Sequence, residues 1–345
     1  MHVARGRVLY VGGVAVWGLG LIIGWAGIAH AGPFTHKTSQ GEALGPHATR
    51  PLIMPKGWLE VGLRASTKAS DQYRTSKGKL VSHDGAWRYS QVWLSLRQGF
   101  SKTVTLYADV PWVSAELSPA VGTTTRTIAM GDAHVGILME PWSWETAGVG
   151  LQVDLKAPSG VEWPGGASGG PNQVESFLTG TGVTNVGAHL LARVDVAGRV
   201  GVRGSAGVVA KPPAVVGYVL QDDGFGNGWL DPGDEVRLEG TVVGQLHPLV
   251  AMTVGARWSR RGEYQMGVSG PGTTTRELSP LPGGTGQFTD GSVGLSWSVT
   301  QHWEVSAEAS RSLAGTDTRT FAHLGLEEFS PQPGNTFGLG VVARW

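Results

Sequence analysis

From residue 58 to the C-terminus, apolar and polar side chains alternate with a period of two. Val149, Leu151, Val153 and Leu155 alternate with glycine and polar residues, and residues 293–299 repeat the pattern. Successive side chains of a β-strand point to opposite faces, so this period predicts strands rather than helices. Twelve strands are expected, at residues 58–66, 88–99, 103–114, 130–141, 146–157, 184–195, 199–211, 235–246, 249–260, 290–300, 302–312 and 335–345.

The connections between these strands alternate between short and long. The short ones lie at residues 99–102, 141–146, 196–199, 247–248 and 300–301, and the long ones at 67–87, 115–129, 158–183, 212–234, 261–289 and 313–334. Short periplasmic turns, long outer loops and an even strand count are typical of transmembrane β-barrels. The sequence therefore predicts an all-β fold, a transmembrane antiparallel up-and-down barrel of about twelve strands over residues 58–345.

A soluble β-sandwich is the alternative, because its strands also alternate. In this chain, however, the polar face of nearly every strand carries glycine, serine, threonine and charged residues. Such a face cannot form a soluble core, so the apolar face must point outward, into lipid. A closed barrel suits that setting because it leaves no backbone group unpaired.

The N-terminus has the pattern of an export signal. Arg5 and Arg7 precede an apolar run over residues 8–28, and Ala29-His30-Ala31 follows. This order predicts a signal peptide over residues 1–31, although the run is also long enough to be an uncleaved anchor. Residues 32–57 are polar and proline-rich; we interpret them as a periplasmic lead-in, which could alternatively tuck into the barrel lumen. The expected location is the outer membrane of a Gram-negative-type bacterium.

The composition excludes disulfides, one class of metal site and nucleic acid as a partner. With no cysteine among 345 residues, disulfides and thiolate metal sites are excluded. The net charge is +0, so the chain lacks the excess of basic residues that is typical of nucleic-acid-binding proteins. Outer-membrane lipid and a small-molecule cargo are the expected partners, and the sequence makes no prediction of oligomeric state.

Charged residues on the polar face are candidates for the lumen lining. Opposite charges balance there, which fits either a charged pore that selects polar solutes or a ladder of ion pairs that fills a narrow lumen. The candidates are Arg64, Arg97, Asp109, Asp132, His134, Asp154, Lys156, His189, Arg193, Arg203, Arg237, Glu239, Arg257, Glu304 and Glu308, and the same face carries Glu60, Glu140 and Arg344.

One outer connection, residues 222–235, resembles a cation-binding loop. Asp222, Asn227, Asp231 and Asp234 offer oxygen ligands between turn-forming glycines, and Ca²⁺ prefers such ligands. The spacing does not match an EF-hand, and a solvated acidic turn is the alternative. Apart from this possible Ca²⁺ site, no cofactor is expected.

Nothing in the sequence predicts an enzyme. A barrel hydrolase would need His-x-Ser on one strand, and no histidine here is followed in that way. His134 and His189 lie on different strands, where lone histidines are more often hydrogen-bonded than catalytic.

Tryptophans concentrate near the predicted strand ends. Trp58, Trp142, Trp144, Trp303 and Trp345 fall at the periplasmic ends, where an interfacial aromatic belt is expected.

The segment Leu96-Arg-Gln-Gly-Phe-Ser-Lys-Thr-Val-Thr-Leu-Tyr-Ala-Asp-Val-Pro-Trp-Val113 resembles a hairpin of one family of bacterial outer-membrane barrels. This family is labelled as transporters or as meta-pathway of phenol degradation proteins. Further matches in the same order are Gly131-Asp132, Leu155-Lys-Ala-Pro-Ser-Gly160, Thr179-Gly-Thr-Gly-Val-Thr-Asn-Val-Gly187, Pro232-Gly-Asp-Glu235 and Phe337-Gly-Leu-Gly, which together span most of residues 51–345. Departures at Ser101-Lys102, Ala157 and Ser159 concern turns.

The resemblance implies a transport barrel and specifies no substrate. The expected function is an outer-membrane channel or transporter for small molecules, hydrophobic or aromatic compounds among them. The alternative function is a structural or surface-interaction barrel with a sealed lumen and no transport.

Overall fold

The computed structural model describes residues 47–48, 50–75, 77–119, 124–160, 180–221, 224–268, 279–280, 286–300, 302–316 and 334–345. The predicted signal peptide lies outside the described residues. No helix in the described part of the chain is long and apolar enough to cross a membrane.

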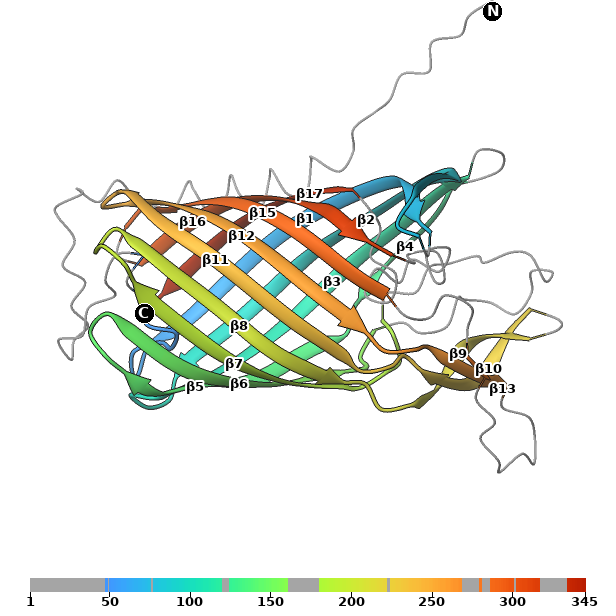
Figure 1. The fold of residues 1–345 in the computed structure, drawn as a ribbon, viewed down its shortest axis with the longest axis horizontal. Helices are drawn as coiled ribbons and strands as arrows, with labels where there is room; N and C mark the ends of the chain where they lie inside the picture. Colours follow the sequence, from blue (N-terminus) through green and yellow to red (C-terminus); the bar gives the residue numbers. More distant parts are fainter. Residues whose placement is uncertain are drawn as a thin grey trace, which may run out of the picture. The chain divides into compact units, whose positions relative to one another are not determined.

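Twelve antiparallel strands form a closed up-and-down barrel (Figure 1). Each strand pairs with its neighbours in chain order, and β1 pairs with β17 to close the ring, with Leu63 opposite Val341. Closure leaves no unpaired edge. The barrel strands are β1 (Leu59–Arg74), β2 (Leu80–Gly99), β3 (Val104–Pro119), β5 (Ala133–Ser143), β6 (Ala147–Ala157), β7 (Asn185–Asp195), β8 (Val200–Ala210), β11 (Glu235–His247), β12 (Val250–Arg261), β15 (Gly286–Ser298), β16 (Trp303–Gly315) and β17 (Asn335–Arg344).

An apolar belt covers the outside of the barrel. Alternate residues of the strands are large, apolar and exposed, such as Leu151, Val153 and Leu155 on β6 and Val293 and Leu295 on β15. Their neighbours along each strand point into the lumen. This arrangement reverses that of a soluble protein and fits a lipid surrounding, as the sequence predicts.

At the side of the long connections, β1, β2, β3, β15 and β16 extend beyond their predicted ends, whereas β6, β7, β8, β11 and β17 match the prediction within one residue. The predicted loop 67–87 is wrong, because β1 runs to Arg74, β2 begins at Leu80 and only a tight turn joins them. Likewise β3 continues to Pro119, inside the predicted loop 115–129, and pairs there with β4 (Thr125–Met130). Backbone pairing continues here although the side chains no longer alternate clearly.

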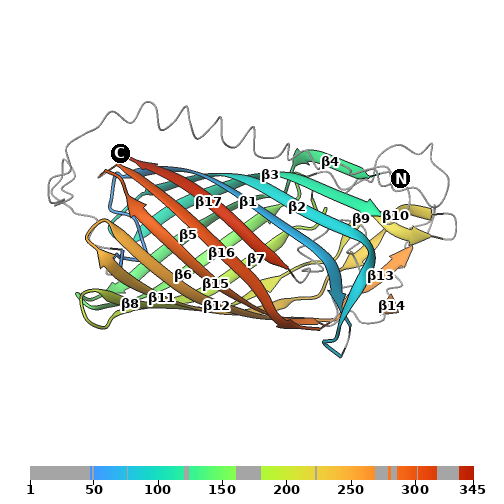
Figure 2. The same cartoon turned by 90° about the horizontal axis from the view of Figure 1, so that it is seen from above.

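A second, four-stranded sheet forms within two of the predicted loops. It contains β9 (Ala214–Gln221), β10 (Gly224–Asp231), β13 (Gln265–Val268) and β14 (Ser279–Pro280). The C-terminus and the turn between β11 and β12 lie at the opposite end of the barrel from this sheet (Figure 2). We therefore assign the C-terminal end as periplasmic.

Three of the five tryptophans of the predicted aromatic belt have the exposure that such a belt requires. Trp142, Trp144 and Trp345 are strongly exposed. Trp303 is half-buried, and Trp58 is buried, packing against Met54 inside the barrel rather than facing lipid.

Candidate functional site

The lumen contains a cavity of about 610 Å³ near its periplasmic end. Its walls come from barrel strands and from the lead-in, which enters the lumen with residues 47–48 and 50–54. Of the two interpretations of the lead-in, the structure thus supports the one in which it tucks into the barrel. The lining includes small, charged and aromatic side chains, among them Gly62, Ser95, Arg97 and Trp93.

Backbone groups of the lead-in bond to side chains of the barrel wall. The amide of Leu52 donates to Glu140 Oε2 at 2.8 Å, and that of Met54 donates to Thr105 Oγ1 at 2.8 Å. Ala48 packs in a buried apolar cluster with Val243 and Ala251. A segment that crosses a polar lumen outside the β-sheet needs such partners for its backbone groups.

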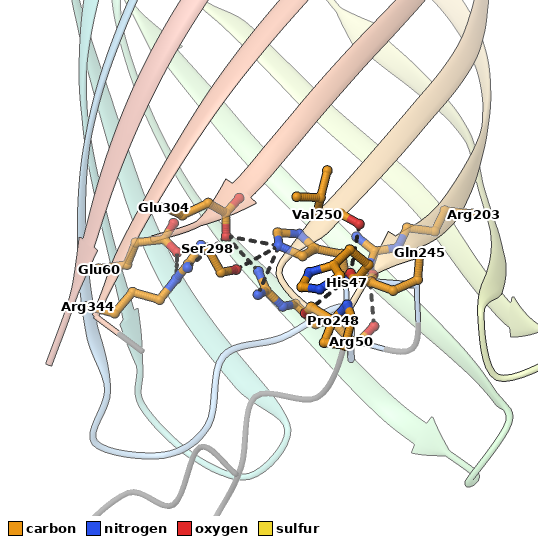
Figure 3. Close-up of polar contacts among 11 residues, drawn as sticks. His47, Arg50, Glu60, Arg203, Gln245, Pro248, Val250, Ser298, Glu304 and Arg344 are labelled. Carbon is orange, nitrogen blue, oxygen red and sulfur yellow. Dashed lines mark hydrogen bonds and ion pairs between the residues drawn. The ribbon is translucent and has the colours of Figure 1, made fainter. Parts of the chain in front are cut away.

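A chain of ion pairs fixes the side chains of the lead-in (Figure 3). Arg50 Nη1 lies 2.8 Å from Glu304 Oε2, which also accepts from Arg344 Nη1 at 2.9 Å. Arg344 Nε then donates to Glu60 Oε2 at 2.6 Å. These groups are largely buried, so removing one partner would leave an uncompensated charge.

His47 lies against the same cluster. Its Nε2 is 3.0 Å from Ser298 Oγ and 3.3 Å from Arg50 Nη2. A guanidinium group only donates, so Nε2 is the acceptor and the ring is neutral. Burial, followed by the charge of Arg50, lowers the pKa of His47 to about 4.

Glycines of the barrel wall make room for the lead-in backbone. A methyl group added to Gly201 on β8 would overlap the carbonyl of Ala48, and one added to Gly99 would overlap the carbonyl of Pro55. The glycine-rich inner face therefore provides space where the lead-in lies, although glycine weakens a strand.

Two further charged clusters lie beyond the cavity, toward the outer end. At the start of β5, Asp132 accepts from Lys156 at 3.2 Å and from Thr181, which anchors the start of the segment before β7. At the start of β11, Glu235 lies 2.8 Å from Lys211 and 2.7 Å from Arg237.

The predicted lumen residues divide into three groups. Arg64, Arg97, Asp109, His134, Arg203 and Glu304 line the cavity. A second group does not line the cavity. In it, ion pairs join Asp132 with Lys156, Arg193 with Glu140, Arg237 with Glu235 and Arg257 with Asp290, Glu308 pairs with the cavity-lining Arg64, and Asp154 lies 3.6 Å from His189. Glu239 is exposed on β11, opposite Arg257 on β12.

Sequence reasoning missed His47, Arg50 and Trp93. The first two precede any strand pattern and carry no local signal. Trp93 occupies a polar-face position of β2, next to His134 with ring centroids 5.7 Å apart, and its period-two position could have identified it.

The candidate Ca²⁺ ligands are distributed over a hairpin. Asp222 lies outside the described residues, and Asn227 belongs to β10. Asp231 Oδ1 accepts from the Gly233 amide at 3.1 Å, and Asp234 Oδ1 accepts from the Lys211 amide at 3.0 Å. The described residues include no group of three acidic or histidine side chains placed to hold a metal, and Ca²⁺ binding stays a prediction.

Comparison with solved structures shows the fold. The outer-membrane channel COG4313 from Pseudomonas putida F1 matches with a TM-score of 0.61 and 15% identity, over 85% of this chain and 97% of that one. The translocator domain of the autotransporter NalP from Neisseria meningitidis matches with a TM-score of 0.43 and 10% identity, over 85% and 90% of the two chains. No protein-family model and no curated protein matches the sequence.

Closure of twelve strands, an outward apolar belt and a charged lumen agree on one setting. Barrels of this kind occupy outer membranes. The chain is an outer-membrane β-barrel protein of the Gram-negative type, with the fold also seen in an outer-membrane channel.

Proposed function

We propose that this protein is a channel that carries small molecules across the outer membrane. The observation that carries the proposal is the cavity of about 610 Å³ within the lumen, which has a charged and polar lining. Water and polar solutes are stabilised by such a lining, whereas a structural barrel needs no internal space.

The described part of the lead-in, residues 47–48 and 50–57, narrows the periplasmic end of this channel. Arg50 and Glu304 hold it by an ion pair with side chains that are 13% and 11% exposed. Passage therefore requires either a path beside the lead-in or its displacement.

A sealed barrel is the second candidate, and the same ion pairs favour it. A segment fixed by buried charges could close the lumen permanently. For the channel, we also propose membership of the phenol-degradation barrel family and a hydrophobic or aromatic cargo. A liposome uptake screen with neutral aromatic and polar solutes would distinguish these two classes of cargo.

Single-channel recording in planar bilayers tests the channel. The purified protein should give discrete current steps. Glu304→Gln should give larger steps, because Arg50 and Arg344 lose a shared carboxylate and the lead-in loosens.

Glu308→Gln is the matched control. Glu308 also pairs with an arginine, Arg64 at 3.0 Å, but both side chains are exposed and the pair includes no group of the lead-in. Exposed pairs contribute about 0.2–1 kcal/mol, so this variant should leave the lead-in in place and change the step size less than Glu304→Gln does. Silent bilayers with folded wild type and folded Glu304→Gln would support the sealed barrel instead.

A further inference from the structure

The cavity lining carries more positive than negative groups. Five arginines face three carboxylates among the described lining residues; they are Arg50, Arg64, Arg97, Arg203 and Arg344 against Glu60, Asp109 and Glu304. His47 adds no charge near neutral pH, because its pKa is lowered to about 4.

Two of the three carboxylates, Glu60 and Glu304, already form close ion pairs with arginines. Arg344 bonds both Glu60, at 2.6 Å, and Glu304, at 2.9 Å. Arg50 takes the remaining strong contact of Glu304 at 2.8 Å. Glu308, outside the lining, pairs with Arg64 at 3.0 Å. Little negative charge is left for Arg97 and Arg203.

Arg97 and Arg203 are the arginines that this cluster leaves least neutralised. Arg97 reaches Glu60 only at 3.8 Å, and half of its side chain is exposed to the lumen. Arg203 donates to the carbonyls of His47 and Arg50, at 2.9 and 3.4 Å, and forms no ion pair within the described part of the chain. Its buried Nε has no hydrogen-bond partner among the described residues.

Space for a ligand exists beside Arg97. Gly62 and Gly340 carry no side chain, and Ser95 has a small one, so β17, β1 and β2 leave a hollow in the wall. Leu52 and Met54 of the lead-in and the ring of Trp93 border the same cavity and supply apolar surface. A guanidinium group next to such surface suits a small organic anion, because guanidinium binds carboxylate in a two-point geometry.

We propose that the cavity selects small organic anions, with Arg97 contacting the carboxylate of the passing solute. This inference rests on the proposed channel function and names its substrate class. Asp109 lies on β3 within the same cavity and opposes the effect. Selectivity is therefore set by the balance between Arg97 and Asp109.

Reversal potentials across a bilayer with a potassium butyrate gradient test this proposal. The wild type should pass butyrate in preference to potassium. Arg97→Gln should lower the butyrate-to-potassium permeability ratio by roughly threefold, and Asp109→Asn should raise it by a similar factor, as expected for one weakly screened charge.

Arg257→Gln is the matched control. Arg257 is equally exposed and is paired with Asp290 at 2.7 Å, but it does not line the cavity. Block of chloride current by butyrate, with neutral butyramide as the reference solute, should weaken in Arg97→Gln and stay unchanged in Arg257→Gln.

The outcomes separate the two proposals. Absence of current in every variant would refute the channel itself. Current with no preference for butyrate, or with equal effects of Arg97→Gln and Arg257→Gln, would overturn the anion site and leave the channel standing.

Discussion

His47 makes the binding of the lead-in inside the barrel depend on pH. Its ring is neutral in the seated lead-in, with a pKa of about 4 against an ordinary value of 6.5. A group that resists protonation when bound stabilises the bound state fully above its ordinary pKa and loses that contribution as the pH falls. The charged groups facing it are Arg50, Arg203, Glu304 and Arg344, of which three are cations.

Acidification should therefore loosen the lead-in. Between pH 6.5 and 4 the loss amounts to on the order of 3 kcal/mol, so single-channel conductance should rise over this interval. The control is His47→Gln, which cannot titrate there, whereas Glu304 is present in both proteins and changes both alike. Equal pH profiles of the two proteins would mean that His47 does not hold the lead-in.

Single residues were predictable from the sequence only where a strand gave them a period. Glu304 and Arg203 occupy polar-face positions, and the alternation predicts that they face the lumen, where the cavity contains them. Arg203 lies 156 residues along the chain from His47, and Glu304 lies 254 residues from Arg50. His47 and Arg50 belong to a segment with no periodic pattern. Which charges meet depends on closure of the barrel, and local sequence does not encode that.

At the scale of elements, the lead-in packs closely against β8 because Gly201 has no side chain. Gly201 faces the carbonyl of Ala48 so closely that any β-carbon would overlap it. Alanine normally suits a strand better than glycine, so only the lead-in makes glycine favourable here.

Gly201→Ala should accordingly displace the lead-in and increase conductance while the barrel still folds. Gly204→Ala on the same strand is the control, because the nearest atom to its added β-carbon would lie 3.6 Å away, in ordinary contact. Bilayer recording measures the conductance, and migration of unboiled samples on a detergent gel reports folding. Unchanged conductance in a folded Gly201→Ala barrel would contradict the proposed position of the lead-in against β8.

Element boundaries were predictable at the periplasmic ends but only at some outer ends. The outer ends of β6, β7 and β11 lie within one residue of the prediction, whereas β1 and β2 extend much further than predicted. Within the membrane, lipid on one side and lumen on the other impose alternation, as in β6. Beyond the membrane both faces of a strand meet water, so residues 67–74 of β1 are polar on both faces and resemble a loop, although they pair with β2. The hairpin of β9 and β10 is hidden in the same way by its glycines.

For the molecule as a whole, the apolar belt is the property that defines its solvent. Leu295 points outward with 51% of its surface exposed, while the next residue, Ser296, lines the cavity. In a soluble protein the exposed position would tolerate a charge and the inner one would not. In a membrane barrel the preference is reversed.

Leu295→Arg and Ser296→Arg test this reversal on adjacent residues of β15. Arginine on the lipid side near the midplane costs about 2–4 kcal/mol, whereas an aqueous lumen hydrates it. Leu295→Arg should thus lower the free energy of unfolding in lipid vesicles, measured by urea titration, by about that amount, and Ser296→Arg should change it by less than about 1 kcal/mol. If Ser296→Arg were the more damaging of the two, the assignment of lipid and lumen faces would have to be exchanged, and with it the cavity's role as a path across the membrane.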